Sequence, residues 1–224
     1  MVAFFITFVK QPGEFRFSRC SLAHSRCCVF SPTTVAWPCE NCTTFFILTA
    51  MAGLTEYYSQ FFTATILEWK QLLKKDRYKD IIVSSLQFLV QNKRVAVYGF
   101  VIMPNHIHII WQIAQGHKRE HVQRDFLKFT AQQIKMDLQK RDKALLESFK
   151  VNAKDRMYQI WERNPLSIDI YSEKVMLQKL QYIHQNPLQE RWRLSNEAEG
   201  YRYSSAQFYS KGNSEWKFLS HYLG

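Results

Sequence analysis

The sequence predicts an α+β sandwich over residues 51–224, with one sheet and helices packed on a face of it. Two observations lead to this prediction. Segments rich in Phe, Ile, Val and Thr alternate with segments whose apolar residues recur at helical spacing. Their order is strand, helix, strand, strand, helix, extended segment and helix, which fits a single sheet covered by helices. Hydrophobic residues make up 46% of the chain, enough to fill such a core.

The first four elements are expected between residues 60 and 112. A strand is predicted over 60–67, which is rich in Phe, Thr and Ile, and a helix over 81–91, where apolar residues return at helical intervals. Two β-rich runs follow, 95–103 and 105–112, and Pro104 separates them.

The remaining elements are a long helix, a mixed segment and a final helix. Residues 120–138 have the pattern of an amphipathic helix. Residues 158–170 are mixed and are expected to be partly extended. The segment Ser172-x-x-Val175 opens the last clear helix, which Pro187 ends.

Residues 1–50 differ from the rest, and we expect them to be an irregular N-terminal extension upstream of a natural start at Met51. They contain a Ser/Thr/Pro stretch and no sustained periodicity. All five cysteines lie there, at Cys20, Cys27, Cys28, Cys39 and Cys42. Cysteines crowded at one end argue against a disulfide framework, and the single C-x-x-C spacing of Cys39 and Cys42 is a weak signal for zinc.

The charge balance indicates a polyanionic partner. The chain has 30 Lys and Arg against 19 Asp and Glu, a net charge of +11. Because residues 1–50 contain four basic and two acidic residues, residues 51–224 keep a charge of +9. Such an excess favours nucleic acid, although a solvated basic surface has the same composition. The apolar runs 2–9 and 43–54 fall short of the roughly twenty residues that cross a bilayer, so we expect a cytoplasmic protein.

Two histidines on a predicted strand are the first candidates for chemistry. They lie in the run M-P-N-H-I-H-I-I-W at 103–111. Because side chains alternate along a strand, His106 and His108 project from one face as neighbours, while Ile107 and Ile109 point to the other face and can enter the core. A pair of neutral imidazoles is a good start for a metal site. Two polar histidines on a solvated face would show the same pattern.

A tyrosine and an asparagine near the end of the last helix are the second candidates. They lie in the run L-Q-Y-I-H-Q-N-P at 180–187. Tyr182 and Asn186 are four residues apart and share one ridge of a helix. The apolar stripe that would seat this helix on the sheet consists of Met176, Leu180 and Ile183. The tyrosine is therefore expected beside the buried face, next to an amide that can coordinate a cation, although an ordinary half-buried tyrosine fits as well.

Together, M-P-N-H-I-H-I-I and the downstream Y-I-H-Q-N-P strongly resemble the REP-associated tyrosine transposases, a branch of the insertion-sequence-type HUH single-tyrosine transposases. The likeness runs from about Tyr57 to Tyr209 and includes R-D-F-L-K-F-T at 124–130 and Y-R-Y-S-S-A at 201–206. Residues 1–50 find no counterpart. The resemblance implies a ferredoxin-like α+β domain with a central antiparallel sheet.

The resemblance also implies roles for the candidate residues. His106 and His108 would be the HUH metal ligands, Asn186 the third ligand, and Tyr182 the catalytic nucleophile. The implied cofactor is a divalent metal, Mg²⁺ or Mn²⁺, and the implied partner is single-stranded DNA at hairpin or palindromic repeats. The family transfers DNA strands through a 5′-phosphotyrosine and leaves a free 3′-hydroxyl. It implies a monomer or a homodimer.

The predicted chemistry agrees with the residue types. A phenol is a poor nucleophile at neutral pH because it is almost fully protonated, so it needs a nearby cation or base and correct placement on phosphorus.

On the helix predicted over 120–138, Arg124, Lys128 and Lys135 share a face and could contact DNA phosphates. Solvation alone would also explain that basic face.

Two other functions fit the same residues. A domesticated protein could bind DNA hairpins without cutting them, and a hydrolytic metalloenzyme could use water in place of Tyr182. A pure binder would not need His106, His108 and Tyr182, so their presence favours the strand-transfer enzyme.

Overall fold

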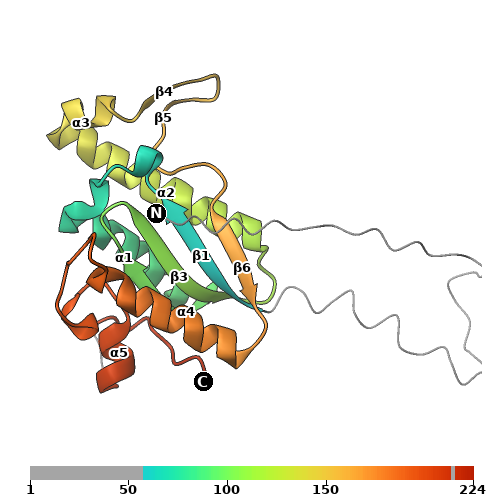
Figure 1. The fold of residues 1–224 in the computed structure, drawn as a ribbon. Helices are drawn as coiled ribbons and strands as arrows, with labels where there is room; N and C mark the ends of the chain where they lie inside the picture. Colours follow the sequence, from blue (N-terminus) through green and yellow to red (C-terminus); the bar gives the residue numbers. More distant parts are fainter. Residues whose placement is uncertain (1–57, 213–214) are drawn as a thin grey trace, which may run out of the picture. The chain divides into compact units, whose positions relative to one another are not determined.

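The computed structural model describes residues 58–212 and 215–224, so the predicted extension 1–50 and its cysteines lie outside the described residues. The described part contains a four-stranded antiparallel sheet with the strand order β2-β3-β1-β6 (Figure 1). Its strands are β1 (Ser59–Thr65), β2 (Val95–Ile102), β3 (His106–Ile113) and β6 (Leu166–Ile170).

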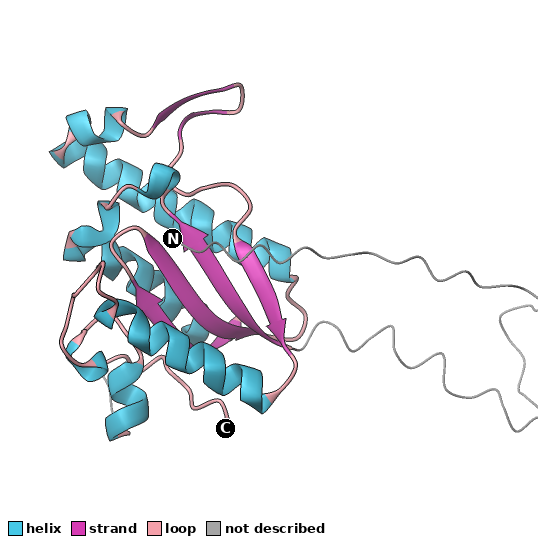
Figure 2. Cartoon of the chain, in the orientation of Figure 1, coloured by secondary structure: helices cyan, strands magenta, loops and turns pink. Residues whose placement is uncertain are grey.

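The connections give this sheet its topology. Helix α1 (Asp76–Gln91) joins β1 to β2, and helix α2 (Arg119–Arg141) lies between β3 and β6 in the chain. These elements follow one another as strand, helix, strand, strand, helix and strand, and the first and third strands lie in the centre of the sheet. This is the ferredoxin-like arrangement. Figure 2 shows the sheet between its helices. The α+β class and the central antiparallel sheet predicted from the sequence are confirmed.

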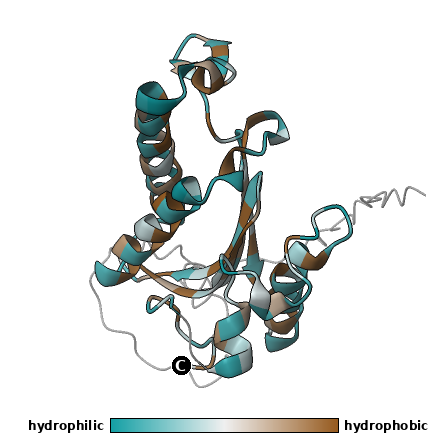
Figure 3. Cartoon of the chain, turned by 90° about the vertical axis from the view of Figure 1, so that its left-hand side faces the viewer, coloured by the Kyte–Doolittle hydropathy of each residue, from teal (hydrophilic) through white to brown (hydrophobic). Residues whose placement is uncertain are grey.

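Helices cover both faces of the sheet, whereas the sequence analysis placed them on one face. Alternate residues of β1 face opposite sides: Phe62 belongs to the larger hydrophobic cluster, with α1 and α2, and Phe61 to a smaller cluster under α4 (Glu173–Gln185). The difference arises because α4 buries its own apolar stripe, Met176, Leu180 and Ile183, on that second face. Figure 3 shows the sheet with α2 on one side and α4 on the other.

The predicted boundaries hold with small shifts. The first strand ends at Thr65, because Ile66 leaves the strand to form an isolated bridge with Trp161. Helix α1 begins at Asp76, five residues before the predicted start at 81. Its first turn is polar in sequence and therefore lacks an apolar repeat, but Lys79 Nζ donates to Asp76 Oδ1 at 2.8 Å within it. The predicted start of the last helix is confirmed.

That helix start depends on one side chain. Ser172 Oγ accepts a hydrogen bond from the Val175 amide at 3.3 Å, which satisfies one of the donors left unpaired at a helix N-terminus. At the other end, Pro187 lies in a short 3-10 helix, Asn186–Leu188, that follows α4 directly.

Several short elements lack a sequence pattern that would predict them. They are α3 (Lys143–Glu147), the two-stranded sheet of β4 (Lys150–Ala153) and β5 (Arg156–Tyr158), and α5 (Ala206–Lys211). Each is too short for helical or strand periodicity to stand out. Within the described residues, no helix combines the length and the apolar character needed to cross a membrane.

Glycine at position 99 permits the close approach of α4 to the sheet. A Cβ atom at Gly99 would lie 2.8 Å from Leu180 Cδ2 and 3.0 Å from Ile183 Cδ1, both closer than ordinary carbon contacts. β2 also has an irregular register with β3 between Val97 and Gly99, where the backbone bends under the helix.

We therefore expect Gly99→Val to lower the free energy of unfolding by about 1–3 kcal/mol, the usual cost of overpacking a core. The measurement is urea unfolding followed by circular dichroism. Ala96→Val, at a half-buried position of the same strand, is the matched control and should change stability by less than about 0.5 kcal/mol. Equal stability of the two variants would show that α4 does not depend on the missing side chain.

Candidate active site

The two predicted histidines lie side by side on the central strand β3. His106 pairs with Thr65 of β1 and His108 with Thr63, and both imidazoles point to the α4 side of the sheet. The ring centroids are 4.8 Å apart, and both side chains are buried. Ile107, by contrast, enters the large cluster on the opposite side, as the alternation predicts.

Each imidazole is held through its Nδ1 atom. His106 Nδ1 lies 2.6 Å from Asn105 Oδ1, and His108 Nδ1 lies 2.7 Å from Thr63 Oγ1. Asn105 Nδ2 donates to the Trp69 carbonyl oxygen at 3.2 Å, so the amide oxygen is the atom that faces His106. Since that oxygen can only accept, His106 carries its proton on Nδ1 and keeps a lone pair on Nε2. Partners of this kind orient the histidines of metal sites.

Both histidines are neutral at physiological pH. Burial lowers the pKa of His106 to about 4, with a smaller contribution from the charge of Arg191. Burial also lowers the pKa of His108 to about 3, aided by His106 and by the charge of Lys179. A metal binds the neutral imidazole, so the protein presents both side chains in the form a metal requires.

Asn186 completes a group of three donors at the end of α4. Its side chain is fully buried, and its Nδ2 lies 3.4 Å from His106 Nε2. Two atoms of the group, Asn186 Oδ1 and His108 Nε2, are buried without a hydrogen-bond partner. Buried polar atoms are nearly always paired, so two unpaired atoms within one group of side chains call for a ligand. Two imidazoles and one amide oxygen fit a divalent cation.

The donor set contains no carboxylate. Among the residues that the structure describes, no group of three or more His, Cys, Asp or Glu side chains could enclose a metal ion. The candidate site is therefore an uncharged set of three donors.

Tyr182 lies at the mouth of this group. Its ring centroid is 5.3 Å from that of His108 and 6.0 Å from that of Phe61. The side chain is 42% exposed, although its neighbours are buried. The Tyr182 side chain therefore packs against His108 and is partly open to a large substrate.

Two cations flank the site, and the sequence analysis missed both. Lys179 Nζ lies 4.8 Å from the centroid of the Phe61 ring. The Arg191 guanidinium lies 5.4 Å from the centroid of the Trp192 ring, which is itself 6.0 Å from His106. Lys179 is one turn before Tyr182 on α4, a spacing that could have drawn attention to it.

Asn105 and Thr63, the partners of the two histidines, were also missed. Asn105 precedes His106 within the M-P-N-H-I-H motif, so its position next to the pair was available from the sequence. Thr63 lies 45 residues before His108, and only the register of β1 against β3 reveals it.

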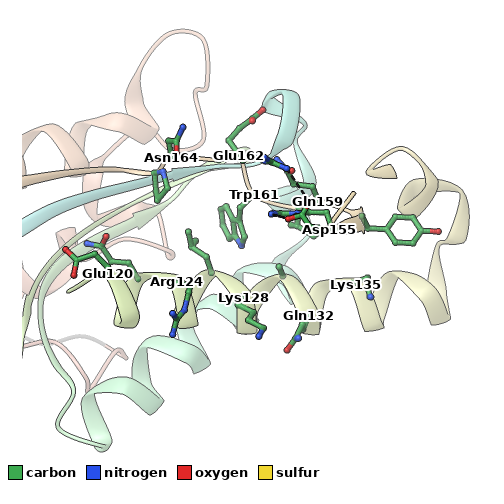
Figure 4. Close-up of a pocket in the computed structure, with 18 residues that line it drawn as sticks. Glu120, Arg124, Lys128, Gln132, Lys135, Asp155, Gln159, Trp161, Glu162 and Asn164 are labelled. Atoms are coloured by element: carbon green, nitrogen blue, oxygen red, sulfur yellow. Dashed lines mark hydrogen bonds and ion pairs between the residues drawn. The ribbon is translucent and has the colours of Figure 1, made fainter. Parts of the chain in front are cut away.

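The predicted DNA-binding residues lie elsewhere. Arg124, Lys128 and Lys135 all line a hollow of about 910 Å³ between α2 and the segment 155–165 (Figure 4). Helix α2 packs on the sheet face opposite to α4, so these residues do not meet the histidines and Tyr182. Arg124 forms an ion pair with Asp125 at 2.9 Å. The structure thus brings His106, His108, Asn186 and Tyr182 together and keeps the basic face of α2 apart.

Comparison with known proteins supports the fold. A solved REP-associated tyrosine transposase bound to a REP hairpin is similar with a TM-score of 0.51 at 17% identity, over 73% of this chain and 86% of that chain. A putative transposase from Deinococcus radiodurans R1 has a TM-score of 0.39 at 15% identity, over 59% of this chain and 93% of that chain. No protein-family model and no curated protein matches the sequence. The resemblance predicted from the motifs is thus confirmed at the level of the fold, which this chain shares with the REP-associated tyrosine transposase.

Proposed function

We propose that this chain is a metal-dependent single-stranded DNA endonuclease and transposase that cuts and rejoins DNA at hairpin-forming elements through Tyr182. One observation supports this most strongly. The exposed side chain of Tyr182 packs against His108 and lies one helical turn before Asn186, and His108 Nε2 and Asn186 Oδ1 are both buried without a hydrogen-bond partner. A domesticated binder that never cuts DNA would have no use for this arrangement.

The proposed reaction exchanges one phosphodiester for another. Tyr182 Oη loses its proton and forms a bond to phosphorus while the bond from phosphorus to the 3′-oxygen breaks. The leaving 3′-oxygen takes up a proton, which leaves a 5′-phosphotyrosine and a free 3′-hydroxyl. A 3′-hydroxyl can later attack the phosphotyrosine and release Tyr182. Because no water is consumed, the strand is rejoined without ATP.

His106, His108 and Asn186 would hold the divalent metal, Mg²⁺ or Mn²⁺. When bound, the cation would polarise the scissile phosphate and offset charge on its oxygens. The protein's own contribution is to keep the imidazoles neutral by burial and oriented by Asn105 and Thr63.

Positive charge near the site suits a DNA strand. Besides burial, the charge of Arg191 lowers the pKa of His106 and that of Lys179 lowers the pKa of His108, so a phosphate at the site would interact with two cations. The structurally similar transposase was solved with a REP hairpin. We propose hairpin DNA as the partner of this chain as well, with the basic face of α2 as a second phosphate contact.

Removal of His108 or Asn186, each with a buried atom that has no hydrogen-bond partner, should weaken metal binding. We expect His108→Ala and Asn186→Ala to reduce Mn²⁺ affinity by about 10- to 100-fold or more, and Thr63→Val by about 10-fold. The measurement is the electron paramagnetic resonance signal of free Mn²⁺ titrated with the full chain. His121→Ala, which removes an exposed histidine of α2, should bind as wild type. Wild-type affinity in His108→Ala would refute this ligand set.

Covalent capture tests the proposed reaction directly. The full chain is incubated with a single-stranded hairpin oligonucleotide with flanking DNA and with Mn²⁺ or Mg²⁺, and adducts are resolved on a denaturing gel. We expect an SDS-resistant adduct that requires the metal and is lost in Tyr182→Phe and His106→Ala. Thermal unfolding of Tyr182→Phe should match the wild type, since the side chain is partly exposed and the substitution keeps its ring.

Two other outcomes would contradict the proposal. Tight hairpin binding with no adduct would favour a domesticated DNA-binding protein. Cleavage without an adduct that persists in Tyr182→Phe would indicate attack by a metal-activated water.

The basic face of α2 should contribute electrostatically to DNA binding. If Lys128 and Lys135 each contact one phosphate, Lys128→Ala/Lys135→Ala should reduce the slope of log Kd against log salt by about 1.4 where both phosphates are single-stranded and by about 1.8 where both lie in the duplex stem. Fluorescence anisotropy of a labelled hairpin at several salt concentrations gives that slope. Lys211→Ala/Lys217→Ala, which removes two exposed lysines of the C-terminal segment, is the matched control. An unchanged slope would exclude the α2 face as a phosphate contact.

A further inference from the structure

A large exposed aromatic side chain lies next to the candidate metal ligands and has no role in the proposed reaction. Trp69 is 61% exposed, and its ring centroid lies 6.3 Å from that of His106, in an edge-to-face arrangement. A buried indole could be explained by packing. An exposed indole at this position leaves a flat apolar surface open beside the site.

The backbone that presents Trp69 is strained. Glu68 and Trp69 have φ values of 55° and 57°, so two successive residues with side chains adopt the left-handed conformation. This region is uncommon outside glycine, asparagine and aspartate, and a bulky aromatic there is an outlier. Such strain persists only where the surroundings impose it, and it gathers at ligand sites.

Several contacts impose this conformation. The Trp69 amide donates to the Ile66 carbonyl oxygen at 2.9 Å, and the Glu68 amide donates to Glu162 Oε1 at 2.7 Å. Lys70 forms an ion pair with Glu68 at 2.8 Å. The indole is thus attached to a fixed turn, which lowers the entropy lost when a ligand stacks on it.

One side chain links this turn to the candidate metal site. Asn105 donates from Nδ2 to the Trp69 carbonyl oxygen at 3.2 Å and accepts at Oδ1 from His106 Nδ1 at 2.6 Å. The position of Trp69 and the orientation of His106 are therefore set by the same amide. A ligand that stacks on Trp69 would be fixed relative to whatever His106 binds.

The same face of the sheet offers a second open surface. Leu166 and Ile168 of β6 are exposed, and they pair with Thr63 and Phe61, whose side chains face α4. Unpaired bases have flat apolar faces joined by a charged backbone, and the charges nearby come from Lys179 and Arg191. Apolar surface mixed with cations fits single-stranded nucleic acid better than a second protein.

We infer that Trp69 stacks on an unpaired nucleobase of the substrate strand, next to the phosphate that Tyr182 attacks. This assignment rests on the proposed function and adds to it a positioning residue for the DNA. Base stacking tolerates any base, so Trp69 would fix the strand without selecting its sequence.

Binding to two labelled probes tests the assignment in the full chain. The probes are a twelve-residue oligothymidylate and an abasic strand of the same length, which carries the phosphates without the bases. Loss of one stacked base weakens binding by roughly 5- to 150-fold. We expect Trp69→Ala to lose affinity for oligothymidylate in this range, to bind the abasic strand as wild type, and to keep the wild-type salt slope. Trp69→Phe should restore most of the affinity.

Phe129→Ala is the matched control, because it removes an exposed aromatic from α2, on the opposite side of the sheet. Wild-type affinity of Trp69→Ala for oligothymidylate would overturn the inference, and so would an equal loss for both probes or a wild-type chain that binds neither. A change in sedimentation of Trp69→Ala without a change in DNA binding would also overturn it and would indicate a contact between copies of the chain.

The same binding measurements in Tyr182→Phe separate this inference from the proposed function. They require no covalent step. If the hairpin gives no covalent adduct with the wild type but Trp69→Ala still binds oligothymidylate more weakly, the stacking inference is supported and the strand-transfer proposal is refuted. If the hairpin adduct forms and Trp69→Ala binds oligothymidylate as wild type does, the strand-transfer proposal is supported and the stacking inference is refuted.

Discussion

The alternation of side chains along β3 is the constraint on which the rest of the structure depends. β3 is a central strand with helices over both of its faces, and five of its eight residues are Ile or Trp. One face supplies Ile107, Ile109 and Trp111 to the main core, and the other presents His106 and His108. A shift of one residue in the register of β3 would put the imidazoles into that core and expose the apolar residues. The energy that fixes the core register therefore also fixes the histidine pair.

Helix α4 turns that pair into a site. Its apolar stripe seats it on the second face of the sheet, closely because residue 99 is glycine. Helical geometry then determines the rest: Tyr182 follows Lys179 by one turn and precedes Asn186 by another. Asn186 begins the 3-10 turn after α4, and its buried amide lies 3.4 Å from His106, while Tyr182 stays at the surface. One packing surface thus positions a buried amide and an exposed tyrosine.

Local patterns predicted what depends on local geometry. The alternation of 103–111, the helix start at Ser172 and the four-residue spacing of Tyr182 and Asn186 could all be derived from the sequence, and the family motif added their roles. Contacts between distant segments could not. Thr63 supports His108 only because of strand register, and Trp69 reaches His106 only because a strained turn follows β1. The shared basic face of Arg124, Lys128 and Lys135 could be predicted from the sequence. Its position on the sheet face opposite to α4 could not, because the sequence does not reveal on which face of the sheet each helix packs.

The composition of the donor set has a consequence for how metal and DNA would bind. Two neutral imidazoles and an amide bring no negative charge, and Lys179 and Arg191 add positive charge nearby. A divalent cation held there alone would keep its full charge in a partly buried place, which is unfavourable. A DNA phosphate beside it supplies the missing negative charge, so each would strengthen the binding of the other by the same factor. Under the proposed function, the metal would be held more tightly when a strand is present than in the free chain, and the absence of a carboxylate is what links the two.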